Sequence, residues 1–175
     1  MPGVAEIVLG AIDNALEMGY PAVTTIGRMS VTPDIPAAVP DSVRFTIDAR
    51  HPDRDQQELL FRRHEELIER VAAERGLRAS WDIVLDMPPS PCDRGVVDVI
   101  HAAAQSAGVP AMEMVSGAVH DTQRMAAIAR TAMIFVRSKD GRSHTPAEFT
   151  STADAAAGAT VLANALRTLA YGEQP

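Results

Sequence analysis

The chain has 175 residues, of which 46% are hydrophobic and 22% charged, a size and composition that fit one globular domain or two small ones. Its net charge of -7, the lack of a basic block and an aromatic content of 4% argue against a nucleic-acid surface and favour a cytoplasmic metabolic protein. The single cysteine, Cys92, excludes an internal disulfide and a cysteine-only metal site, and no apolar run is long enough to span a bilayer.

The first quarter of the chain predicts a helix followed by β structure. Apolar residues recur at helical spacing from Val4 to Met18, and Gly19 ends this pattern. β-Branched residues predict a strand between Val23 and Val31. The three prolines between Thr32 and Ser42 predict an exposed loop or an interrupted sheet edge, because proline cannot donate to a strand ladder.

A second strand is predicted from Val43 to Arg50, where apolar and polar residues alternate. The pattern is typical of a half-buried antiparallel strand. Arg50 is the last residue of this strand. It follows Asp48 by two positions and so lies on the same polar face. A solvated ion pair between the two would explain this arrangement and would contribute little stability. The alternative is functional, because the planar fork of an arginine can bind both oxygens of a carboxylate.

A long helix is expected next, capped by Asp53 or Asp55 and running to about Arg75, with Gly76 at its end. We expect His64, which lies among charged residues of this helix, to be solvated. The stretch from 77 to 85 predicts another strand. The order helix, strand, strand, helix, strand favours an α+β fold with two helices on one face of an antiparallel sheet.

A domain boundary is predicted at the proline-rich stretch Met87–Pro91, which gives domains at 4–87 and 88–175. Cys92 follows and is interpreted as a packed or incidental thiol. The second domain alternates helix and strand and indicates a partial α/β layer. Its expected elements are helices at 93–107, 122–128 and 152–171 and strands at 112–115 and 131–136. Two strands cannot satisfy both sheet edges or bury both faces, so this layer is expected to be incomplete.

Two histidines follow the expected strands of the second domain, His120 and His144, each with a carboxylate nearby, Asp121 and Glu148. Such a set could hold zinc or manganese, although the spacing is not diagnostic. His144 could equally be a loop residue bonded to a nearby carbonyl. Ser116 near His120 weakly resembles a nucleophile pair, but no orienting acid is evident.

Four motifs together resemble the carboxyl-terminal half of the N-carbamoyl-L-amino-acid hydrolase and allantoate amidohydrolase family, which belongs to the metal-dependent aminoacylase and carboxypeptidase superfamily. Each motif is weak alone, but their order and spacing are similar to those of the family over nearly the whole chain. The motifs are Thr25-Ile26-Gly27-Arg28, Phe45-Thr46-Ile47-Asp48-Ala49-Arg50-His51-Pro52, Ser116-Gly117-Ala118-Val119-His120-Asp121, and Met133-Ile134-Phe135-Val136 with Ser143-His144-Thr145-Pro146-Ala147-Glu148.

The resemblance implies a lid or dimerisation domain at 4–87, whose sheet edge pairs with that of a second subunit, and the end of a catalytic domain at 88–175. It implies that Arg50 binds the substrate carboxylate and that Val119 and His120 line the substrate pocket. His144 would be the last ligand of a site for two zinc or manganese ions. In the family, such a site cleaves a linear amide or ureido bond with the help of a glutamate.

The departures from the family pattern are also informative. The other metal ligands and the catalytic glutamate lie in an amino-terminal half that would precede Met1, so no catalytic residue is expected within this chain. Ala37-Ala38-Val39-Pro40 replaces the family's Asn-Val-Ile-Pro, which removes a substrate-binding amide. Val119 replaces a glycine, and a β-branched residue there hinders close approach of substrate to the backbone.

These inferences predict a hydrolase of C–N bonds in linear amides, namely N-carbamoyl amino acids or ureido compounds such as allantoate. One histidine ligand cannot hold a dinuclear centre, so the isolated chain is expected to be inactive or nearly so. Two alternatives stay open: one piece of a split hydrolase, completed by a partner that carries the missing half, and a non-catalytic dimerisation or binding module. No nucleic acid or membrane partner is expected.

Overall fold

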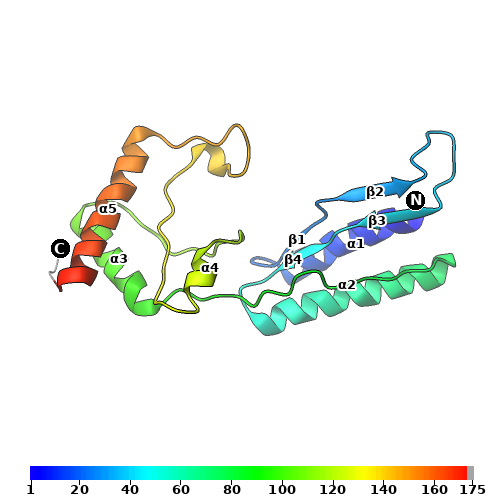
Figure 1. The fold of residues 1–175 in the computed structure, drawn as a ribbon, viewed down its shortest axis with the longest axis horizontal. Helices are drawn as coiled ribbons and strands as arrows, with labels where there is room; N and C mark the ends of the chain where they lie inside the picture. Colours follow the sequence, from blue (N-terminus) through cyan, green and yellow to red (C-terminus); the bar gives the residue numbers. More distant parts are fainter. Residues whose placement is uncertain (173–175) are drawn as a thin grey trace. The chain divides into compact units, whose positions relative to one another are not determined.

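The computed structural model describes residues 1–172 and divides the chain into two compact units, Met1–Pro89 and Ser90–Pro175 (Figure 1). The division falls within the proline-rich stretch Met87–Pro91. The fold class is α+β, as the sequence predicts, with helices in both units and antiparallel strands in the first. Within residues 1–172, none of the helices combines the length and the hydropathy that a bilayer crossing needs.

Two helices organise the first unit, α1 (Pro2–Met18) and α2 (Arg54–Arg75). Asp53 caps α2 by accepting a hydrogen bond from the Gln56 N–H at 3.0 Å, and Gly76 ends it in the left-handed conformation, with φ of 62°. Both helices are therefore confirmed to within two residues of their predicted limits. The core between them consists of Ile7, Ala11, Leu67 and Val71.

The strands of the first unit are shorter than predicted, because each predicted strand is interrupted near its middle. Thr25 lies opposite Asp48 in one ladder, and Met29 lies opposite Phe45 in the other. Phe45 and Ile47 pack against the core of α1 and α2, so the strands cover one side of the helix pair. The antiparallel pairs are β1 (Val23–Thr25) with β4 (Asp48–Arg50) and β2 (Met29–Thr32) with β3 (Ser42–Phe45).

The prediction of a solvated His64 is wrong, because only 4% of this residue is exposed. Its Nδ1 lies 3.1 Å from Asn14 Nδ2 and its Nε2 lies 3.0 Å from Thr24 Oγ1. The spacing from Leu60 and to Leu67 places His64 on the buried stripe of α2. The charged neighbours that suggested exposure lie on the other faces of the helix.

The predicted strand at 77–85 is also wrong: this stretch is irregular and exposed. Ile83 and Val84 are 66% and 92% exposed, and Trp81 Nε1 donates to Glu65 Oε1 at 2.9 Å. β-Branched and aromatic residues favour a strand only where a neighbouring strand offers its backbone groups. Within the described residues, no strand pairs with this stretch.

The second unit is built on α3 (Arg94–Ser106) and α5 (Thr152–Tyr171), which lie side by side (Figure 1). Asp93 accepts from the Val96 N–H and Ser151 Oγ accepts from the Asp154 N–H, each at 3.0 Å, which fixes where the two helices begin. Both predicted helices are confirmed. The core that joins them consists of Ala103, Ala104, Val161 and Ala165, with Ile134 packed against it.

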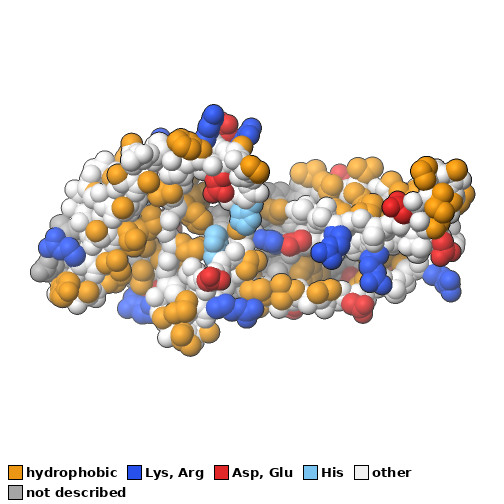
Figure 2. All heavy atoms as spheres, turned by 45° about the horizontal axis from the view of Figure 1, so that its top comes forward, with side chains coloured by type: hydrophobic (Ala, Val, Ile, Leu, Met, Phe, Trp, Pro, Cys, Tyr) orange, Lys and Arg blue, Asp and Glu red, His pale blue; other side chains and the backbone are white. Residues whose placement is uncertain are grey.

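The strands expected at 112–115 and 131–136 do not form in the part of the second unit that the structure describes. Residues 131–134 are half-buried, and Phe135 is 49% exposed. Among the described residues neither stretch has a strand partner, so the predicted two-strand layer is not formed. Figure 2 shows hydrophobic side chains distributed over the visible faces of both units.

Two short helical segments complete the second unit. The helix expected at 122–128 is confined to α4 (Thr122–Met125). A short 3₁₀ turn, η1 (Lys139–Gly141), follows the stretch 131–136.

Candidate functional site

Arg50, at the end of β4, forms a two-pronged contact with Asp48 of the same strand. Its Nε donates to Asp48 Oδ1 at 2.6 Å and its Nη2 donates to Oδ2 at 2.7 Å. The two side chains are 39% and 50% exposed. The contact lowers the pKa of Asp48 and raises that of Arg50, in both cases chiefly through these hydrogen bonds. Arg50 is thus held in the geometry with which an arginine binds a carboxylate.

His144 lies on a compact loop between η1 and α5. The Lys139 N–H donates to the Phe149 carbonyl at 2.8 Å, which closes the base of this loop. The His144 N–H donates to Glu148 Oε2 at 3.0 Å, and the Glu148 N–H donates to the Thr145 carbonyl at 3.0 Å. The loop is therefore supported by its own hydrogen bonds.

The backbone of His144 adopts a φ of 58°, in the left-handed region that residues other than glycine seldom occupy. The side chain is exposed. A strained conformation that the surrounding loop maintains is common at ligand-binding positions. His144 is thus exposed on a loop with an unusual backbone conformation. Glu148, which the sequence analysis placed beside His144, accepts the hydrogen bond from the His144 backbone N–H.

His120 precedes α4 and is half-buried. Its Nε2 lies 2.9 Å from Ser116 Oγ, and its ring packs edge-on against Phe135 with ring centroids 5.6 Å apart. The Ser116–His120 pair considered in the sequence therefore forms. Val119 is 53% exposed, so its side chain adds bulk to the surface beside His120. The contact with Phe135 was missed, because only the fold brings the two segments together.

The described residues do not form a complete metal centre. No group of three or more histidine, cysteine or carboxylate side chains in residues 1–172 could hold an ion. The candidate set of His120, Asp121, His144 and Glu148 is not assembled into one site. A dinuclear centre requires more donors than the single histidine ligand that the sequence assigns to it.

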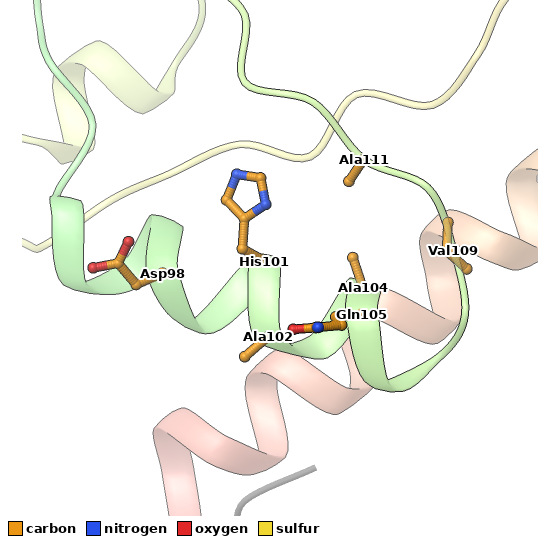
Figure 3. Close-up of a pocket in the computed structure, with 7 residues that line it drawn as sticks. All are labelled: Asp98, His101, Ala102, Ala104, Gln105, Val109 and Ala111. Atoms are coloured by element: carbon orange, nitrogen blue, oxygen red, sulfur yellow. The ribbon is translucent and has the colours of Figure 1, made fainter.

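A shallow cavity of about 490 Å³ lies on the surface of α3 (Figure 3). Asp98, His101 and Gln105 line it together with small apolar side chains. Arg94 bonds to Asp98 at 2.8 Å and also reaches Glu113, which lies 3.3 Å from His101 Nε2. None of the site residues predicted from the sequence lines this cavity. The carboxylates of Asp98 and Glu113 are already paired with Arg94.

The chain is similar in sequence to a known protein family and to characterised enzymes. Residues 3–168 match the family described as Peptidase family M20/M25/M40. The chain is 33% identical over 173 residues to the N-carbamoyl-L-amino acid amidohydrolase of Geobacillus stearothermophilus, covering 99% of this chain and 42% of that protein. It is 33% identical over 147 residues to the allantoate amidohydrolase of Bacillus subtilis, covering 84% of this chain and 36% of that protein.

Solved structures agree with the sequence comparisons. An amidase of the hydantoinase/carbamoylase family from Burkholderia vietnamiensis superposes with a TM-score of 0.88 at 32% identity, covering 94% of this chain and 40% of that chain. The corresponding amidase from Burkholderia ambifaria gives a TM-score of 0.84 at 30% identity, with coverage of 95% and 40%. The chain therefore spans about 40% of the length of these relatives.

Proposed function

Because the chain belongs to the Peptidase family M20/M25/M40, whose members are generally metal-dependent, we propose that it forms part of a hydrolase that cleaves C–N bonds in linear amides. The proposed substrates are N-carbamoyl-L-amino acids and ureido compounds such as allantoate. The names of the Geobacillus and Bacillus relatives support this substrate class. Both kinds of substrate carry a carboxylate, which the site must bind.

The observation that carries the proposal is the geometry of Arg50. Its guanidinium already holds two carboxylate oxygens, those of Asp48, at 2.6 and 2.7 Å. A substrate carboxylate presents the same pair of oxygens, so the same fork suits it. In the proposed enzyme Arg50 anchors the substrate carboxylate, while Val119 and His120 line the pocket.

His144 is proposed as the last ligand of a site for two zinc or manganese ions. Its exposed position on a self-supported loop favours this role. The described residues do not fit the complete centre, so the remaining ligands and the general base must come from other residues. The isolated 175-residue chain is accordingly proposed to be inactive or nearly so.

The quaternary arrangement proposed for the first unit is a homodimer that pairs through a sheet edge. Each strand of the unit has one paired neighbour, so its other edge offers backbone groups to a second copy. The acidic composition supports a cytoplasmic location. A partner that carries the part of these relatives that this chain does not cover would make the chain one piece of a split hydrolase.

A chimera tests the proposed activity. In it, this chain replaces the matching segment of the Geobacillus N-carbamoyl-L-amino acid amidohydrolase, which supplies the rest of the enzyme. With manganese or zinc, the chimera should hydrolyse N-carbamoyl-L-amino acids, and His144→Ala should abolish turnover. Arg50→Lys should raise KM more than it lowers kcat, because lysine cannot bind both oxygens.

The second candidate is a non-catalytic dimerisation or binding module, which the open strand edges of the first unit favour. A folded chimera that fails to hydrolyse N-carbamoyl amino acids and allantoate would refute the hydrolase proposal. A stable dimer of the chain, measured by light scattering, would then support the module. Circular dichroism of the chimera distinguishes lost activity from failed folding.

A further inference from the structure

His120 is held by two neighbours from different segments of the second unit. Ser116 Oγ lies 2.9 Å from its Nε2, and the Phe135 ring meets it edge-on at an interplanar angle of 62°. The hydroxyl fixes how the imidazole is turned, and the phenyl ring limits its tilt. Together these contacts hold a side chain that is only half-buried in one orientation.

The hydrogen-bond distances indicate which atom donates. The Ser116 hydroxyl has one hydrogen and two possible acceptors, His120 Nε2 at 2.9 Å and the Ala118 carbonyl at 3.3 Å. An O–H donor usually lies within about 3.0 Å of its acceptor, so the contact with the carbonyl is long. Ser116 Oγ also accepts from the Ala118 N–H at 3.2 Å, which occupies a lone pair of the same oxygen. Of the two acceptors, Nε2 therefore lies at the better distance for the hydroxyl hydrogen.

We propose that Ser116 is a positioning residue that holds neutral His120 with its proton on Nδ1, so that this N–H donates to an oxygen of the substrate. An imidazole whose Nε2 accepts a hydrogen bond must carry its proton on Nδ1 when it is neutral. Within residues 1–172, no protein group hydrogen-bonds to His120 Nδ1. The inference rests on the proposed function, in which His120 lines the substrate pocket.

The chemical consequence is an uncharged donor at a fixed place. An Nδ1–H group can bind a carbonyl or carboxylate oxygen of a linear amide without first taking up a proton. In this proposal the Ser116 hydroxyl does not contact the substrate and acts only through His120. Removal of the hydroxyl should therefore change the tautomer and orientation of His120 while leaving the other histidines unchanged.

The test is nitrogen NMR of the histidine rings in the ¹⁵N-labelled 175-residue chain at about pH 8, where an ordinary imidazole is neutral. We expect His120 to show a protonated Nδ1 and an unprotonated Nε2. Ser116→Ala should shift the ring toward a mixture of both tautomers, and Ser116→Thr should keep the wild-type pattern. Ser106→Ala, which removes an exposed hydroxyl at the end of α3, is the matched control and should change nothing.

Two results would overturn the inference: a proton on Nε2 in the wild-type chain, or the same tautomer in wild type and Ser116→Ala. The wild-type spectrum alone decides the first, even if a variant folds poorly. In the chimera, Ser116→Ala should raise KM about fivefold, as the loss of one hydrogen bond implies, and Ser116→Thr should restore it. A folded but inactive chimera would refute the proposed function, whereas the ring spectra would still decide the tautomer.

Discussion

His64 Nδ1 lies 3.1 Å from Asn14 Nδ2, so a hydrogen bond joins α2 to α1 inside the first unit. Thr24 Oγ1 contacts the other ring nitrogen at 3.0 Å, which adds β1 to the same connection. The Asn14 amide can donate to Nδ1 only while that nitrogen is unprotonated. The contact therefore favours the neutral ring, as burial does, and makes the stability of this unit depend on pH.

Acid should destabilise the first unit through His64. Burial lowers its pKa from 6.5 to about 4, so between these values the unfolded chain binds more protons than the folded one. The free energy of unfolding should therefore fall as the pH drops from 6.5 to 4, by up to about 3 kcal/mol from this residue. Urea unfolding at a series of pH values measures the slope.

His64→Gln is the informative variant, because it keeps a polar side chain and removes the titration. Its free energy of unfolding should change less with pH in this window than that of the wild type. His101→Gln removes a more exposed histidine of the second unit and serves as the control. Equal slopes for wild type and His64→Gln would contradict the role assigned to the buried ring.

Asp48 should compete with an incoming carboxylate for Arg50. Because both groups of the pair are partly exposed, the contact contributes roughly 0.5–1 kcal/mol. Asp48→Asn removes the charge, so the affinity of the chain for N-carbamoylglycine should rise about two- to fivefold. A titration that follows the Arg50 Nε–H signal by NMR measures this affinity. Unchanged or weaker binding would show instead that Asp48 helps to hold the substrate site.

α5 passes close to Val136 at Gly158. A Cβ atom at this position would clash with Val136 Cγ1. Gly158→Ala should therefore lower Tm, although alanine favours a helix by about 1 kcal/mol, because overpacking costs about 1–3 kcal/mol. Adding Val136→Ala should recover part of the loss, and Val136→Ala alone is the control. A higher Tm for Gly158→Ala would contradict this packing.

Local signals in the sequence predict the helices, because their causes are local. Asp53 and Ser151 each accept a hydrogen bond from the backbone at the start of a helix, and Gly76 ends one. His64 could have been recognised as buried from its spacing, which continues the stripe through Leu60. Its charged neighbours led to the wrong prediction of a solvated side chain, because residues adjacent in the sequence of a helix do not share a face.

The strands and part of the site could not be predicted with the same success. A strand at 131–136 requires backbone groups from another strand, and the described residues provide none. Arg50 and His144 were singled out by their motifs, but the contact of His120 with Phe135 depends on the fold. The left-handed backbone of His144 likewise results from the loop that surrounds it.

Metal binding and turnover by the unmodified chain test the central claim most directly. Within the described residues, His144 is the single proposed ligand of a metal centre that needs several. With manganese or zinc, the purified 175-residue chain should retain less than one ion per chain after dialysis and should not hydrolyse N-carbamoyl-L-amino acids above the level of His144→Ala. Two tightly held ions per chain together with turnover that His144→Ala abolishes would contradict it.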